Sequence, residues 1–203
     1  MSRLLHPLPL ICVAALIVGL YRCHGEREID RSPGVLVAEV PVQTDLEAAE
    51  PIEFLGFSLK PRAEFHATVR VLRREDYSNG ALASLVPTDF AVGWGPMSDS
   101  KVLADIRISQ GNRFYYWRTD YWPIPRRDIE IHSANWHVIP ADGGVRAALD
   151  TLRAGSVVEL RGRLVDIDGP ETRMSTSLTR LDTGAGACEI LLASAVRIVE
   201  PGG

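Results

Sequence analysis

Two stretches of strict alternation between apolar and polar residues most constrain how this chain can fold. Between Phe65 and Val71 every second residue is apolar, and the segment from Val158 to Leu164 repeats the pattern with Gly162 at one apolar position. A period of two is typical of a strand with one buried face. Gly162 would also permit the tight bend that a small closed barrel requires. The chain is therefore expected to build its core from β-strands.

The remaining segments predict more strands and two short helices. Further strands are expected at residues 90–94, 113–117, 129–139, 188–193 and 196–199. Helices are expected at 99–108, capped by Ser98, and at 145–152, closed by Gly155. This order predicts a β-rich α+β domain, a small, partly closed β-barrel for which an OB-like arrangement is one candidate.

The N-terminus carries the least polar segment of the chain. Leu10 to Tyr21 contains no charged residue, and the apolar stretch extends back to Leu4 through two prolines. As a helix, those twelve residues would span about 18 Å of a hydrocarbon core that is about 30 Å thick. No small-residue cleavage motif follows. Residues 1–21 are expected to be an uncleaved signal anchor with a transmembrane helix over 4–21, a cleaved signal and a buried helix being the alternatives.

The charges around this segment bear on its orientation. Arg22, Arg27 and Arg31 outnumber Arg3 on the other side, which alone favours a cytoplasmic domain. Long C-terminal domains translocate largely regardless of so small a difference. We therefore expect an inner-membrane, single-pass protein with a polar stalk over residues 22–34 and a periplasmic domain over residues 35–203.

Composition excludes several classes of protein. Hydrophobic residues make up 46% and charged residues 24% of the 203 residues, as in ordinary globular proteins. The net charge of −4 gives no general attraction to nucleic acid, which is not expected as a partner. Three cysteines cannot form a disulfide framework. The sequence contains no phosphate-binding glycine loop, nucleophile elbow or paired-cysteine zinc pattern, so no cofactor is expected.

Aromatic residues cluster between positions 94 and 136, together with arginines. Eight of the fourteen aromatic residues lie there. If residues 113–117 form a strand, Phe114 and Tyr116 share one face and are expected in the core, because Arg113 on the other face prefers solvent. Aromatic rings beside guanidinium groups suit ligands that stack and accept hydrogen bonds. The predicted ligand surface, with core packing as the alternative interpretation, consists of Arg113, Tyr115, Trp117, Arg126 and Arg127.

Two histidines and an asparagine form the second candidate site. His132 and His137 would point to opposite faces of a strand, so a shared metal ion is not expected. Asn135 and His137 share a face and could form a polar site. An exported hydrolase using Asn135, His137 and a carboxylate such as Asp120 is therefore the alternative to a binding module.

Two further features of the C-terminal part resemble catalytic groups but are expected to have structural roles. Residues 181–185 read Leu-Asp-Thr-Gly-Ala, the short signature of aspartic proteases. That chemistry needs a second carboxylate and a longer following chain, so a turn at Asp182 is expected instead. Cys188 has no basic neighbour and stands beside Glu189. It is expected to be a buried thiol rather than a nucleophile.

Several longer motifs resemble a family of uncharacterised bacterial membrane-anchored or exported single-domain proteins. They include Gly93-Trp-Gly-Pro-Met-Ser98, Arg113-Phe-Tyr-Tyr-Trp117 and His132-Ser-Ala-Asn-Trp-His-Val-Ile-Pro140. A fourth runs from Leu178 to Glu189, and the resemblance covers most of residues 54–199. It implies that the anchor and the domain belong together, and it assigns no catalytic residue. The expected function is a membrane-anchored, non-catalytic binding or accessory module of the cell envelope, with an unknown ligand or envelope protein as partner.

Overall fold

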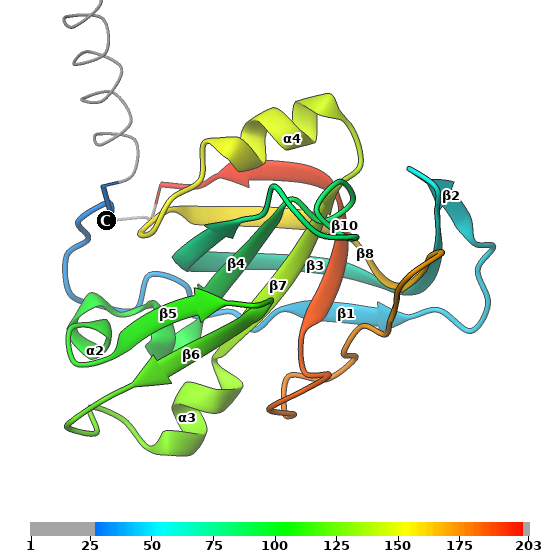
Figure 1. Cartoon of the computed structure of the whole chain (residues 1–203). Helices are drawn as coiled ribbons and strands as arrows, with labels where there is room; N and C mark the ends of the chain where they lie inside the picture. Colours follow the sequence, from blue (N-terminus) through cyan, green and yellow to red (C-terminus); the bar gives the residue numbers. More distant parts are fainter. Residues whose placement is uncertain (1–26, 201–203) are drawn as a thin grey trace, which may run out of the picture.

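The computed structural model describes residues 27–200, in which five strands close into a ring (Figure 1). The ring runs from β3 (Phe57–Asp76) through β4 (Thr88–Gly93), β7 (Ser133–Pro140), β10 (Glu189–Ile198) and β8 (Val157–Asp168) back to β3. Neighbouring strands are antiparallel, except that β7 and β10 are parallel. The expectation of a β-rich α+β domain is confirmed.

The long strand β3 organises the sheet. Its residues alternate between buried and more exposed positions from Phe57 to Val69, as the sequence predicts, but Arg70, expected on the exposed face, is buried as well. The register shifts between Pro61 and Ala63 in its pairing with β8, and such irregularities bend a strand. Along its length β3 pairs with β8 on one side and with three strands on the other, namely β1 (Val42–Asp45), β2 (Ile52–Phe54) and β4.

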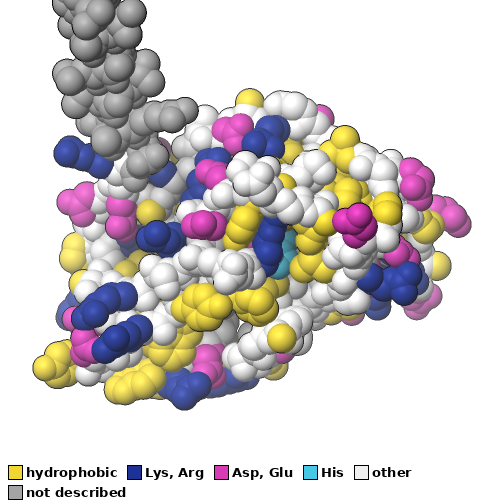
Figure 2. Space-filling view, viewed as in Figure 1, with side chains coloured by type: hydrophobic (Ala, Val, Ile, Leu, Met, Phe, Trp, Pro, Cys, Tyr) yellow, Lys and Arg dark blue, Asp and Glu magenta, His cyan; other side chains and the backbone are white. Residues whose placement is uncertain are grey.

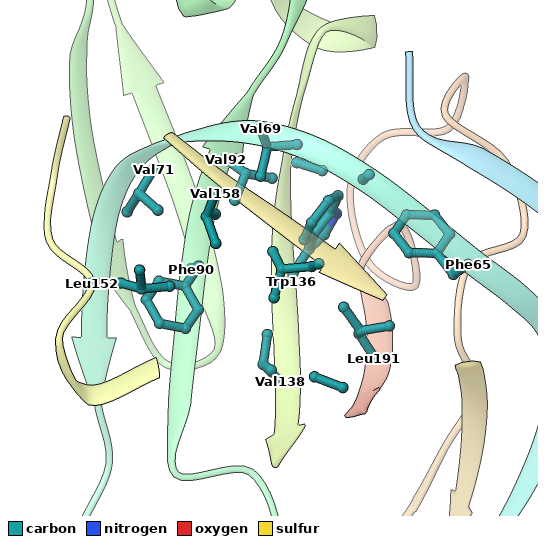
Figure 3. Packing of buried hydrophobic residues seen from close by; sticks show 14 of the residues in the cluster. Phe65, Val69, Val71, Phe90, Val92, Trp136, Val138, Leu152, Val158 and Leu191 are labelled. Carbon is teal, nitrogen blue, oxygen red and sulfur yellow. The ribbon is translucent and has the colours of Figure 1, made fainter. Parts of the chain in front are cut away.

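The interior of the ring holds the main hydrophobic core (Figure 3). Phe65 meets Trp136 edge to face, with ring centroids 5.3 Å apart. Valines and leucines from β3, β4, β8 and β10 surround this pair, among them Val69, Val92 and Leu191. Gly162 of β8 is needed here, because a Cβ atom at this position would lie 2.1 Å from the carbonyl oxygen of Leu192 in β10. The glycine therefore permits close approach of two backbones.

A hairpin of β5 (Arg107–Gly111) and β6 (Phe114–Arg118) forms a second layer outside the ring (Figure 1). Its two-residue turn holds Asn112 and Arg113 at φ values of 53° and 68°, the left-handed region that tight hairpin turns use. Gln110 donates a hydrogen bond from Nε2 to Asn135 Oδ1 of β7 at 2.7 Å. The hairpin thus covers the outer face of β7.

Residues 27–200 contain three short α-helices where two were expected. The prediction of a helix over residues 99–108 is correct only for its first turn. Only α2 (Ser100–Leu103) is helical, because residues 107–111 pair with β6 instead. Asp99, not Ser98, caps it by accepting from Lys101 N at 2.8 Å. The Ser98 hydroxyl instead accepts from the backbone of Val37.

The second and third helices flank β7. Residues 129–131, expected to begin a strand, instead end the helix α3 (Arg126–Ile131). This helix follows Pro125 and is stabilised by the i,i+4 pair of Arg126 and Glu130. The helix expected at 145–152 is present as α4 (Gly143–Asp150). Gly155 lies beyond its end with φ +85°, and its N–H donates to Val71 O at 2.8 Å.

The described part of the predicted stalk, residues 27–34, lies along the domain. Ile29 N donates to Ala154 O at 2.8 Å, Arg31 Nε to Gly155 O at 2.9 Å and Gly34 N to Asp99 Oδ1 at 2.8 Å. The predicted anchor and transmembrane helix, residues 1–21 and 4–21, lie outside the described residues. Within residues 27–200, none of the helices has the length and apolar character needed to cross a bilayer.

Candidate functional site

A cavity of about 410 Å³ opens where the aromatic hairpin, the first residues of β7 and the connection between β9 (Arg173–Met174) and β10 meet. Its walls combine the rings of β6 with polar groups of the other two segments. Figure 2 shows hydrophobic side chains gathered along β6 on this face of the molecule. The lining includes Trp94, Tyr115, Trp117, Asn135, Asp182 and Glu189.

The two faces of β6 are oriented opposite to the expectation. Phe114 and Tyr116, expected in the core, are 40% and 54% exposed. Arg113 instead points inward, where its Nη1 lies 2.9 Å from Oδ1 of the buried Asp89. Its guanidinium carbon also stands 3.6 Å from the centre of the Tyr77 ring. A buried carboxylate of β4 therefore holds Arg113, the turn residue before β6, against the domain, and the alternation from Phe114 to Trp117 is as expected.

Tyr115 and Trp117 follow Arg113 on this inward face. The Tyr115 hydroxyl lies 3.1 Å from Ser133 Oγ, and burial raises the pKa of the phenol to about 12. Trp117 meets Trp122 edge to face at 5.9 Å, and the guanidinium carbon of Arg126 lies 5.9 Å from its ring centre. Both residues thus combine packing against the domain with contact to the cavity.

Of the five residues predicted to form a ligand surface, the cavity brings three together, Tyr115, Trp117 and Arg126. Arg113 forms an ion pair with Asp89, and Arg127 donates a hydrogen bond from Nη2 to Leu181 O at 2.9 Å. Arg126 pairs with Glu130, with 2.8 Å between Nε and Oε1. The pairing with Arg126 is the main reason why the pKa of Glu130 is lowered.

The most unusual group in the cavity is Glu189, the first residue of β10. Its side chain is 1% exposed, and Oε1 lies 2.6 Å from Arg180 Nε. Burial raises the pKa of Glu189 to about 7, although the charge of Arg180 opposes that shift. Oε2 has no hydrogen-bond partner within residues 27–200. Because Glu189 is one of the residues that line the cavity, a ligand bound there could satisfy this carboxyl group.

Sequence reasoning missed the pair of Arg180 and Glu189. Arg180 also stands over Phe65, with 5.4 Å between its guanidinium carbon and the ring centre, so it lies against the edge of the main core. The available signal was a carboxylate at the head of an otherwise apolar strand, Glu189-Ile-Leu-Leu-Ala193. A carboxylate in a buried strand needs a partner.

Asn135 and Cys188 lie at the floor of the cavity. Asn135 accepts from Gln110 through Oδ1 and donates from Nδ2 to Arg113 O at 3.3 Å. Burial, reinforced by the charge of Glu189, raises the pKa of the Cys188 thiol to about 12. Cys188, expected to be buried, is half-buried, and the raised pKa favours its protonated thiol form at neutral pH.

The segment with the protease-like signature forms a turn, as expected. Gly184 and Gly186 adopt φ values of +86° and +88°, in the left-handed region. The hydroxyl of Ser177 donates to Asp182 Oδ2 at 2.8 Å. Asp182 and Thr183 line the cavity from this side. The sequence predicted the turn but not that it would form a wall of the cavity.

The components of the alternative hydrolase site have separate partners. His137 Nδ1 lies 2.9 Å from Asp89 Oδ1, and both side chains are buried. Asp120 pairs on the surface with Arg107 at 2.6 Å and Arg118 at 3.6 Å. His132 Nδ1 lies 2.8 Å from Asp128 O. Residues 27–200 contain no group of three side chains that could hold a metal ion.

A second and larger hollow, of about 1020 Å³, lies between β3 and the end of α4. Its two central arginines have structural partners. Arg70 donates from Nη1 to Ser98 O at 3.0 Å, and burial lowers its pKa. Arg74 donates from Nη1 to Leu149 O, Asp150 O and Leu152 O, the carbonyls that end α4. Because these groups hold elements together, the smaller cavity is the better candidate for a binding site.

Comparisons with known proteins add neither a family nor a ligand to this description. No family model, no curated protein and no solved structure matches the chain. The function therefore has to be argued from the geometry of the cavity.

Proposed function

We propose that this chain is a membrane-anchored, non-catalytic binding module of the cell envelope, and that it binds its ligand in the cavity beside β6. In this proposal residues 4–21 form the anchor in the inner membrane and the domain lies in the periplasm. The resemblance to anchored or exported bacterial single-domain proteins supports the same placement. The single observation that carries the proposal is the unpaired carboxylate oxygen of Glu189, buried at the wall of the 410 Å³ cavity.

The strand order supports an OB-like barrel as the scaffold. An OB-fold is a five-stranded, partly open Greek-key barrel that binds ligands over its second and third strands, between the loops that join strands 1–2 and 4–5. The ring strands in chain order are β3, β4, β7, β8 and β10, and α4 lies between the third and the fourth. The loop between the fourth and fifth strands contains Asp182 and Thr183, which line the cavity. Fold analogy does not identify the ligand.

The state of Cys188 and His137 supports binding rather than catalysis, and Glu189, whose pKa is raised to about 7, is paired with Arg180 through Oε1. Cys188 is held in its thiol form by a raised pKa, and His137 is engaged by Asp89 outside the cavity lining. A nucleophile or general base needs a reactive protonation state and contact with the substrate. The cavity instead offers aromatic rings and a few polar groups, the usual composition of a recognition site.

A pocket-filling substitution tests this proposal. Ala187 lines the cavity and lies in the turn before β10. In Ala187→Trp the indole would occupy the space that the ligand needs. The matched control is Ala81→Trp, which places the same side chain on an exposed turn. The full chain, purified in detergent, is incubated with a small-molecule and peptide extract of the cell envelope and measured by native mass spectrometry.

The expected result is one bound species on the wild type and on Ala81→Trp, and none on Ala187→Trp. The species should be released with its mass unchanged, because the module does not transform its ligand. Equal binding to both tryptophan variants would place the site elsewhere. Release of the ligand as a chemically altered product would contradict the non-catalytic assignment.

A further inference from the structure

We propose that the ligand is a peptide segment in an extended conformation, which adds as a third strand to the free edge of β6. This inference rests on the proposed function and specifies its partner. The two-stranded sheet of β5 and β6 has no further strand among residues 27–200. An unpaired strand edge presents a row of N–H and C=O groups that can pair with another chain.

The register of the hairpin shows which groups are free. A two-residue turn closes on a hydrogen-bonded pair, here Gly111 with Phe114. Hydrogen-bonded and non-hydrogen-bonded pairs then alternate along an antiparallel ladder. Phe114, Tyr116 and Arg118 therefore bond to β5. Tyr115 and Trp117 direct their backbone N–H and C=O groups to the opposite edge.

These outward groups have no partners in the described part of the chain. Neither the turns and loops nor any side chain bonds to the N–H or C=O of Tyr115 and Trp117. The preceding outward carbonyl, that of Arg113, accepts from Asn135 Nδ2. Its contact marks where the free part of the edge begins. One extended segment of two to four residues could form hydrogen bonds with the backbone N–H and C=O groups of both Tyr115 and Trp117.

The cavity follows this edge rather than one face of the strand. Four consecutive residues, Phe114 to Trp117, line it, although their side chains alternate between the two faces of β6. A hollow that touches four consecutive residues of a strand runs beside its backbone. On the far side it is bounded by the turn that contains Asp182 and Thr183. An extended segment can lie between these two walls.

The polar groups in the cavity indicate what the segment carries. Side chains of neighbouring strands alternate together, so residues opposite Tyr115 would point toward β7, as Tyr115 does. The cavity lining includes Glu189, whose Oε2 has no hydrogen-bond partner within residues 27–200, and Asp182. Both accept hydrogen bonds when ionised. The segment is therefore expected to place a side chain with an N–H or O–H donor at this position.

A second copy of the chain fits this edge less well than a peptide. The free edge of β6 ends in Arg118, whose side chain is exposed. Charged residues on an edge oppose edge-to-edge association. The turn at residues 182–184 also limits the space beside β6. A single strand needs only one strand spacing of about 4.8 Å.

The test uses the full chain in detergent and a synthetic library of capped octapeptides, with Lys, Ser, Thr and Val varied at the central positions. Binding is followed by tryptophan fluorescence. For the tightest peptide, amide hydrogen exchange of Tyr115 and Trp117 is measured by NMR with and without peptide. Each peptide N–H is then methylated in turn, which removes the donor and leaves the side chain in place.

The proposal expects slowed exchange at both amides. It also expects a loss of affinity of at least about tenfold, about 1.4 kcal/mol, on methylation at every second position only. Ala187→Trp should abolish binding and Ala81→Trp should retain it. Methylation effects without alternation, or unchanged exchange at Tyr115 and Trp117, would overturn strand addition.

Other outcomes separate this inference from the proposed function. If no peptide binds below about 1 mM while an extracted molecule still binds to wild type and not to Ala187→Trp, the peptide is overturned and the site is retained. If both amides are already protected in a dimer seen by sedimentation, self-association replaces the peptide. If Ala187→Trp affects no binding at all, the proposed site itself fails.

Discussion

Asp89 and His137 face each other across two neighbouring strands, with Asp89 Oδ1 2.9 Å from His137 Nδ1 and neither side chain open to solvent. Arg113 reaches the same oxygen from the hairpin. One buried carboxylate thus joins the ring of strands to the layer outside it. Removing one member of a buried ionic network leaves the charges of its partners buried without a counter-charge.

We therefore expect Asp89→Ala to lower the free energy of unfolding by about 3–5 kcal/mol. Chemical denaturation followed by far-UV circular dichroism measures this change. Asp120→Ala is the matched control, because Asp120 pairs with arginines on the surface, where such pairs contribute about 0–1 kcal/mol. Similar losses for both variants would show that the network around Asp89 is not important for stability.

The inverted faces of β6 give a second prediction. Trp117→Ala should cost about 2–3 kcal/mol, because the ring packs against the cluster of Met97, Ile106 and Ile129. Phe114→Ala should cost less, about 1 kcal/mol, because that side chain is 40% exposed and lies on the outer face of β6. Thermal and chemical unfolding of the two variants compare them directly. A greater loss for Phe114→Ala would restore the orientation that the sequence predicted.

Glu189 should make stability depend on pH. Its pKa rises from about 4.5 in the unfolded chain to about 7 in the folded one. Between these values the folded state holds a proton that the unfolded state has lost. Stability should therefore fall as the pH rises from about 4.5 to about 7, by at most about 1.4 kcal/mol per pH unit, and then level off.

Glu189→Gln cannot titrate and serves as the comparison for that pH dependence. As the pH rises over the same range, the unfolding free energy of the wild type should fall relative to that of the variant. Urea titrations at half-unit steps of pH give the two curves. Parallel curves would mean that the carboxyl group has an ordinary pKa.

Gly162 provides a test of the close approach inside the ring. Gly162→Ala places a methyl group against the carbonyl of Leu192, which should cost about 1–3 kcal/mol as strands shift apart. Gly111→Ala is the control, since a Cβ atom there meets nothing within 4 Å. Differential scanning calorimetry of both variants decides whether the glycine is required by that contact.

The orientation in the membrane can be tested with reporter fusions. Alkaline phosphatase joined to the C-terminus should be active, because it folds only outside the cytoplasm, and a green fluorescent protein fusion should not be fluorescent. The reverse result would place the domain in the cytoplasm. Retention of the full chain in membranes after a carbonate wash distinguishes an anchor from a cleaved signal.

Local patterns predicted the strands of the ring well. Alternation marked the buried faces of β3 and β8, and both are as expected. Helix boundaries were less accurate, because pairing with β6 turned residues 107–111 into a strand. Tertiary contacts of this kind override local propensity, and a sequence pattern does not contain them.

The candidate site shows the same limit more sharply. Arg113 was expected in solvent because arginine usually is, but Asp89, 24 residues earlier, provides a buried partner. Arg180 and Glu189 likewise meet only after β10 has joined the ring. The sequence could show which residues are chemically unusual. It could not show which of them meet, because the contacts are made between distant segments.

The length of β3 has a consequence for how the protein is made. Its partner β8 lies about a hundred residues further along the chain, and the ring closes only when β10, which ends at Ile198, joins both β7 and β8. Pairings between such distant segments form slowly. Nearly all of residues 27–200 must therefore have left the ribosome before the domain can complete its fold, so the strands that emerge first wait for partners that are made last.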